Sequence, residues 1–256
     1  MNLHPKLRIS PLASAFVAIA SCLVAVKSHA AFVTVPNGTS VSLSAAASGA
    51  LGGNVLAFSE TNFSDPSNVP NFSGLLRSIV VDADGAGPLT NLDFYYQVEN
   101  ISTGASATSG YEIFTFATQI GFPNTLTLQA DYISSLGVLG GLALPGSFAT
   151  APSGTKSVDS AYWEFPVPGE FAGFNFVPGI NGANSIDVGE VSNWLVFRTN
   201  ANGFNSVLGA ISYGLGGAEA QTFAPVPEPS TVLFGLAMVG VCAGGRFRKS
   251  ARKNNS

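Results

Sequence analysis

Acidic side chains between Ala31 and Pro225 are the groups of this chain that could do chemistry. Asp82 and Asp84 stand two residues apart before a glycine turn, and Asp93 is twelfth in the count from Asp82. This spacing follows part of the EF-hand calcium-loop pattern, but the fifth position lacks an oxygen ligand and the twelfth is Asp rather than bidentate Glu. An Asp/Gly hairpin loop is a far commoner explanation of such a run, and Asp93 belongs to the following strand, so these three are weak candidates for a metal site and no cofactor is expected.

Glycoside hydrolysis is the second chemistry that carboxylates could perform, because it needs two of them on either side of the scissile bond. The acids that could serve near Tyr162 or Trp163 are Glu112, Asp131, Glu164 and Glu170. The region has fourteen acids, and the sequence does not tell which of them converge. Exposed acids on strands are the simpler interpretation, and we do not expect an enzyme.

Histidine and cysteine are absent from residues 31–225. Both cysteines, Cys22 and Cys242, and both histidines, His4 and His29, lie outside this region. Ser-His-Asp and Cys-His catalysis, histidine acid-base chemistry and Cys/His zinc sites are therefore excluded there. Disulfides are excluded as well, so the 195 residues must be stabilised by an ordinary core.

The charge of residues 31–225 is strongly negative. Fourteen acidic residues stand against three basic ones, Arg77, Lys156 and Arg198, a net charge of −11. Nucleic acid is not expected as a partner, because its binding depends on basic patches. Repulsion between like charges also opposes direct adhesion to acidic polysaccharide, unless divalent cations bridge the two surfaces.

Glycan chemistry has two further kinds of candidate residue. Asn62 heads an Asn-x-Ser triplet with Glu60 two residues before it, as in the extended bacterial acceptor pattern, and is a weak candidate for glycosylation. Three other asparagines head such triplets: Asn37, Asn71 and Asn100. Aromatic rings that could stack on sugars are Tyr95, Tyr111, Tyr132, Tyr162, Trp163, Trp194 and Tyr213. Most aromatic residues in β-sandwiches are core, and Trp194 is expected there.

The candidate residues named above fall mostly on segments that we expect to form β-strands. Leu92 to Val98 alternates apolar and polar residues, which predicts a strand with one apolar face and one polar face. Further strands are expected at 32–35, 41–44, 55–58, 75–81, 111–118, 125–130, 158–165, 173–177, 193–198, 207–213 and 220–223, and a short helix at 131–139. Some 11–12 short strands separated by Gly/Pro/Asn turns predict an all-β protein with a single β-sandwich domain over 31–225.

The N-terminus reads as an export signal. Lys6 and Arg8 precede an apolar run from Leu12 to Val26, and Ser28-His29-Ala30 fits a signal peptidase site. This predicts a signal peptide over 1–30, export by the Sec machinery, and cleavage between Ala30 and Ala31. Ile19-Ala20-Ser21-Cys22 also fits a lipobox, which would instead make a lipidated Cys22 the first residue.

The C-terminus, 226–256, combines three segments. Val226-Pro227-Glu228-Pro229-Ser230-Thr231 is followed by an apolar stretch over 232–245 and a basic tail over 246–256. Fourteen residues of helix rise about 21 Å, whereas a full transmembrane span takes roughly 20 residues. Five basic residues after the stretch favour a cytoplasmic C-terminus, so we expect a marginal inner-membrane anchor with the bulk of the chain in the periplasm.

The order of this motif, short span and basic tail resembles the PEP-CTERM sorting domain. The resemblance implies recognition and cleavage near Pro227-Glu228-Pro229 by a membrane-embedded transpeptidase, an exosortase, which would move the protein from the inner membrane to the cell surface or medium. Three segments also look like ectodomains of other PEP-CTERM proteins without assigned activity: 92–98, 173–176 and 195–201. The implied function is a non-catalytic surface or matrix protein of the biofilm or exopolysaccharide layer. The alternative is a carbohydrate-binding module, with calcium as an assisting ion.

Overall fold

A computed structural model describes residues 32–226, apart from 44–51, 66–71, 86–88, 90, 104–110, 119–121, 124, 137–138, 150–153, 165–170, 177–184 and 215. The elements in chain order are β1 (Val33–Thr34), β2 (Thr39–Ser42), β3 (Asn54–Ser64), β4 (Ser73–Asp82), β5 (Leu92–Asn100), β6 (Ile113–Thr118), β7 (Leu128–Ile133), β8 (Gly140–Gly141), α1 (Gly146–Ala149), β9 (Ser160–Glu164), β10 (Phe171–Asn175), β11 (Trp194–Thr199), β12 (Phe204–Tyr213) and β13 (Gly216–Pro225).

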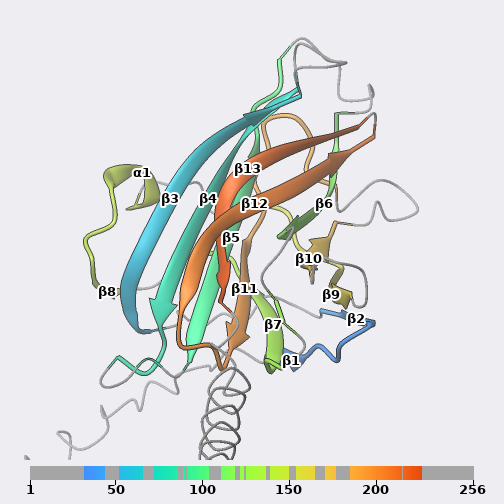
Figure 1. Cartoon of the computed structure of the whole chain (residues 1–256). Coiled ribbons are helices and arrows are strands. Elements are labelled where there is room, and N and C mark those ends of the chain that lie inside the picture. Colours follow the sequence, from blue (N-terminus) through green and yellow to red (C-terminus); the bar gives the residue numbers. More distant parts are fainter. Residues whose placement is uncertain are drawn as a thin grey trace, which may run out of the picture.

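The described chain is nearly all β and forms two sheets (Figure 1). The seven-stranded sheet has the order β1-β7-β11-β5-β4-β3-β8, and the six-stranded sheet has the order β13-β12-β6-β10-β9-β2. The pairings are antiparallel except for the short contact between β3 and β8. Neighbouring strands are often distant in sequence: β11 lies between β5 and β7. Residues about 100 positions apart therefore face each other.

The main core lies between the two sheets. Phe197 of the seven-stranded sheet stacks on Phe174 of the six-stranded sheet, with ring centroids 4.3 Å apart. Tyr96 also packs across the core on Phe116, with tilted rings whose centroids are 4.9 Å apart, and its hydroxyl donates a 2.7 Å hydrogen bond to the Phe223 carbonyl. Alternate residues of each strand supply these contacts, as the period of two requires.

A second apolar layer covers the outer face of the seven-stranded sheet. Figure 1 shows α1 and β8 beside β3. Phe148 of α1 packs against Trp194, with ring centroids 6.3 Å apart. The cluster contains Val55, Ile79, Val81, Tyr95, Ile133, Phe148, Trp194 and Val196, with Phe32, Leu136, Leu139 and Leu144 packed against it. The face of β5 expected to be polar is consequently buried: Asp93, Tyr95 and Gln97 are each 0% exposed.

Every segment expected to form a strand contributes one, with shifted boundaries. The strand expected at 125–130 runs instead from Leu128 to Ile133. The helix expected at 131–139 is wrong, because Asp131 to Ile133 pair with β11, and the one described helix is α1. β8 was not expected, since two glycines carry no strand signal.

The expected signal peptide and the expected C-terminal membrane anchor lie outside the described residues. Within 32–226, no described helix is long and apolar enough to cross a membrane.

Candidate functional site

An ion pair joins β5 and β11 on the outer face of the seven-stranded sheet. Register sets Arg198 opposite Asp93, and the guanidinium donates two hydrogen bonds, from Nε to Oδ1 at 2.8 Å and from Nη2 to Oδ2 at 2.7 Å. The ring of Phe32 lies 4.1 Å from the Arg198 Cζ, a cation-π contact. Burial raises the pKa of the Asp93 carboxyl and Arg198 opposes this rise. The bidentate geometry is that of an ionised pair.

Two buried oxygens near this pair have no hydrogen-bond partner. They are the Tyr95 hydroxyl and Oδ2 of Asp131, which stand on either side of Val196 across three neighbouring strands. Asp131 is 4% exposed, and its other oxygen accepts a 2.7 Å bond from the Tyr132 N–H. Burial raises the pKa of Asp131, with that hydrogen bond acting against it. A buried carboxylate oxygen without a donor is costly, so this face offers a place for a cation or a donor.

The three candidate metal ligands are not arranged as an EF-hand loop. Asp82 accepts the Asp84 N–H at 3.2 Å, and Asp84 accepts the side-chain amide of Asn91 at 2.6 Å. Asp93 is held by Arg198 instead of facing that turn. Among the described residues, no group of three or more His, Cys, Asp or Glu could hold a metal ion. The strands on either side of this turn, β4 and β5, pair in antiparallel fashion.

The acids considered for glycoside hydrolysis are spread over the fold. Asp131 lies on the seven-stranded sheet, whereas Glu164 ends β9 of the six-stranded sheet. Glu112 directly precedes β6 in the same sheet, and Glu170 lies outside the described residues. Asp131 and Glu164, each in a different sheet, do not share a site.

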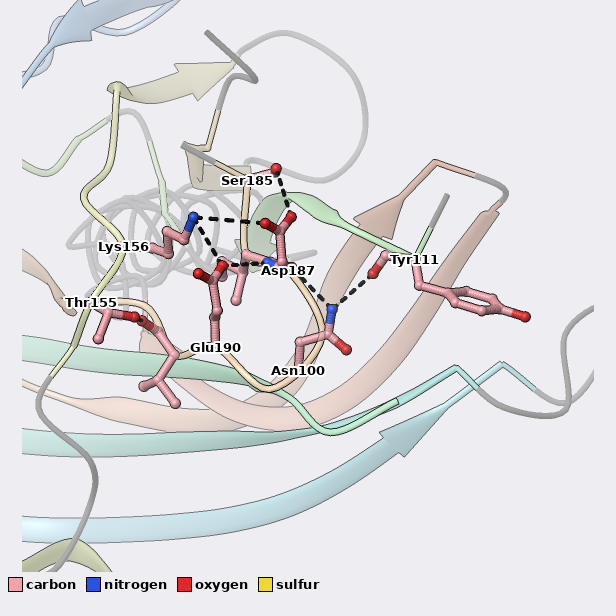
Figure 2. Close-up of polar contacts among 9 residues, drawn as sticks. Asn100, Tyr111, Thr155, Lys156, Ser185, Asp187 and Glu190 are labelled. Atoms are coloured by element: carbon pink, nitrogen blue, oxygen red, sulfur yellow. Dashed lines mark hydrogen bonds and ion pairs between the residues drawn. The ribbon is translucent and has the colours of Figure 1, made fainter. Parts of the chain in front are cut away.

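A second ion-pair cluster joins Lys156, which precedes β9, to acidic residues in the turn before β11 (Figure 2). Its Nζ lies 2.9 Å from Glu190 Oε2 and 3.9 Å from Asp187 Oδ2. Glu190 Oε2 also accepts the Asp187 N–H at 2.8 Å. Gly189, with a φ of 83°, makes the tight turn between them. This cluster holds the loop at 185–191 against Lys156, whose amino group is ion-paired.

Each of the three basic residues of 31–225 is committed to carboxylates. Arg77 Nε lies 3.0 Å from Glu60 Oε2, and its Nη1 lies 2.8 Å from Glu99 Oε2. With the pairs of Lys156 and Arg198, all three basic side chains of 31–225 lie against carboxylates. The sequence alone missed these pairs, because only the register of distant strands brings the partners together.

Most of the aromatic side chains considered for sugar stacking are in the interior. Five are 4% exposed or less: Tyr95, Tyr132, Trp163, Trp194 and Tyr213. Tyr162 and Tyr111 are half-buried, and the Tyr111 ring points away from the Lys156 cluster in Figure 2. Tyr162 lies on the outer face of the six-stranded sheet, against Gly173, where an added Cβ would stand 2.6 Å from its hydroxyl oxygen.

The asparagines of the glycosylation triplets differ in access. Asn62 is exposed, near the C-terminal end of β3, and Glu60, two residues before it, is bound to Arg77. Asn100 is 0% exposed and donates to the carbonyls of Tyr111 and Ile186 at 2.8 and 3.0 Å. Asn37 is half-buried, and Asn71 lies outside the described residues.

The segment expected to be a sorting motif begins directly after β13. β13 ends at Pro225, and the Val226 N–H donates a 3.0 Å hydrogen bond to the Gly203 carbonyl. The remaining motif residues, Pro227 to Thr231, lie outside the described residues, as does the expected cleavage site at Ala30-Ala31. No family model, curated protein or solved structure matches the chain.

Proposed function

We propose that this chain is an exported, non-catalytic surface or matrix protein whose C-terminus is a sorting signal for an exosortase. The observation that carries the proposal is the order of Pro227-Glu228-Pro229, a short apolar span and a basic tail at the end of the chain. Signal peptidase would release the N-terminus in the periplasm. The inner membrane would hold the protein only until the exosortase cuts.

The described fold supports this proposal in one respect. Because Val226 is still hydrogen-bonded to Gly203, the folded domain and the motif are joined without a linker. The two prolines after Val226 each fix φ and favour an extended chain. Glu228 would then be presented as a short exposed segment between the last strand and the membrane.

A non-catalytic role is supported by the side chains available for chemistry. Residues 31–225 contain no His and no Cys, and their Arg and Lys side chains are bound to carboxylates. The remaining surface is acidic and suits a hydrated protein. Contact with exopolysaccharide would involve neutral sugars or bridging divalent cations.

Processing of a Glu228→Ala variant tests the proposal. The motif loses its only charge, so export should proceed normally while a full-length precursor accumulates in the inner membrane. Immunoblots of fractionated cells would follow both forms. Glu164→Ala, a change at an exposed acid of the folded domain, is the matched control and should be processed as the wild type. Shortened Glu228→Ala protein at the surface in wild-type amount would refute the sorting role.

A further inference from the structure

We propose that Lys156 and Asp187 condense within the folded chain to form an amide bond, with Glu190 carrying the protons. The three side chains meet in the ion-pair cluster of Figure 2. The bond would cross-link the segment before β9 to the turn before β11. Because it needs only the folded domain, this proposal does not depend on export or sorting.

The two reacting groups are already in contact. The Lys156 Nζ lies 3.9 Å from Asp187 Oδ2, and the carboxyl carbon Cγ is one bond from that oxygen. Attack by an amine takes place from a separation of about 3–3.5 Å between the reacting atoms, which a small side-chain rotation would reach. Groups held together in this way have effective concentrations of about 10⁵–10⁸ M. Such a concentration favours a condensation that free amines and carboxylates in water do not complete.

Backbone hydrogen bonds fix both sides of the contact. The Lys156 N–H donates to the Val191 carbonyl at 3.1 Å, and the Asn193 N–H donates to the Lys156 carbonyl at 2.8 Å. On the other side, Ile186 exchanges two 3.1 Å hydrogen bonds with Ile113 at the start of β6. The reacting side chains therefore leave from backbone that is tied to strands, which limits the freedom lost on reaction.

Glu190 and Ser185 supply the groups that the chemistry needs. Glu190 Oε2 lies 2.9 Å from the Lys156 Nζ and is held by the Asp187 N–H, which donates to it at 2.8 Å. It can therefore accept a proton from the ammonium. The Ser185 hydroxyl donates to Asp187 Oδ1 at 3.2 Å. This donor can stabilise the negative charge that develops on Oδ1 when the amine adds to Cγ.

The atoms and charges of the step balance. Glu190 takes one proton from the ammonium and passes it to Asp187 Oδ2, so that a neutral amine faces a neutral carboxyl group. The amine nitrogen then bonds to Cγ. Glu190 moves a second proton from this nitrogen to the Oδ2 hydroxyl, the Cγ–Oδ2 bond breaks, and Oδ2 leaves as water. The cluster carries one net negative charge before and after, because the amide is neutral and Glu190 remains a carboxylate.

The amide would close residues 156–187 into a ring that contains β9 and β10. Residues 31–225 have no cysteine, so a disulfide cannot supply a cross-link there. A cross-link stabilises a fold mainly by restricting the unfolded chain, and more so for larger rings. Chain collected before the amide has formed carries the ion pair alone, and a substitution of Lys156 measured in that form reports only on the ion pair.

Peptide mapping of the purified full chain tests the proposal. Trypsin cuts after lysine and arginine, but not after a lysine whose amine has become an amide. Lys156 is the only such residue between Arg77 and Arg198, so the denatured wild type should give one peptide, 78–198, lighter than its sequence by one water. A further digestion after Glu164 and Glu170, inside the ring, should leave the segments that carry the two reacting residues joined.

Glu190→Gln is the discriminating variant, because it keeps both reacting groups and removes the proton acceptor. Trypsin should cut this variant after Lys156 and give two peptides of unreduced mass, as it should for Asp187→Ala. The matched control is Asp159→Asn, a change at an exposed aspartate near Lys156 in the sequence, and it should keep the wild-type result. Far-UV circular dichroism would verify that each variant is folded.

Two results would count against the proposal. Wild-type chain that trypsin still cuts after Lys156, at unreduced mass and after prolonged incubation of the folded protein, would reduce the contact to an ion pair only and overturn the amide. A Glu190→Gln variant that is linked to the same extent as the wild type would overturn the role of Glu190 in moving the protons.

Discussion

Replacing Arg198 by Met tests whether the outer face depends on its ion pair. Asp93 is 0% exposed and takes both of its hydrogen bonds from Arg198, so the substitution leaves a buried carboxylate without compensation. Losing one member of a buried pair costs about 3–5 kcal/mol. Because the Arg198 side chain is 33% exposed and water can reach the vacated position, we expect the lower end, about 3 kcal/mol.

The same loss should be visible in thermal unfolding. For a domain of this size, about 3 kcal/mol corresponds to a fall of about 6–12 °C in Tm. The deficit should depend on pH, because Asp93 can escape the penalty by protonation. Removing Arg198 raises the folded pKa of Asp93 further, so the deficit should be full at pH 7 and should shrink as pH falls through that pKa.

Two variants serve as controls in the same melts, followed by far-UV circular dichroism. Lys156→Met breaks a pair whose partners are more exposed, and we expect a loss of about 1 kcal/mol. Asp93→Asn combined with Arg198→Met should recover part of the loss, since no charge is left unpaired. The reasoning is refuted if Arg198→Met costs no more than Lys156→Met or if its deficit is the same at pH 4 and pH 7.

Two further substitutions test the packing of the sheets and the alternative function. Tyr96→Phe removes the hydroxyl that reaches the Phe223 carbonyl across the core and should cost about 1–2 kcal/mol in urea unfolding; no loss would mean that water satisfies that carbonyl. If the protein binds neutral glycans, Tyr162→Ala should abolish retention on a glycan array while Trp163→Phe, a change in the interior, retains it. Equal binding by both variants would remove Tyr162 as the stacking platform.

The strands could be predicted from the sequence because alternation is a local signal. Leu92 to Val98 shows it clearly, and β5 begins at Leu92. What could not be predicted is what covers each face. The apolar layer built by Phe148 and its neighbours buries residues that alternation marks as polar.

The ion pairs were unpredictable for a related reason. Asp93 and Arg198 are 105 residues apart, and only the placement of β11 beside β5 brings them together. The short segment after Asp131 was misassigned as a helix because its apolar residues fit either period over so few positions. Burial of Asp131 likewise depends on the strands and loops that surround β7.

If the protein is held by its C-terminus, as we propose, the hairpin of β12 and β13 has a mechanical consequence. Every residue of β13 from Gly216 to Pro225 is in register with β12, and Pro225 faces Phe204 at the start of that strand. A tether attached after Val226 pulls on the last residue of this ladder. A force along the strand axis loads all of its hydrogen bonds together in shear, whereas a force across the strand opens them one at a time from Pro225. Resistance to flow would then depend on the direction in which the attachment holds the domain.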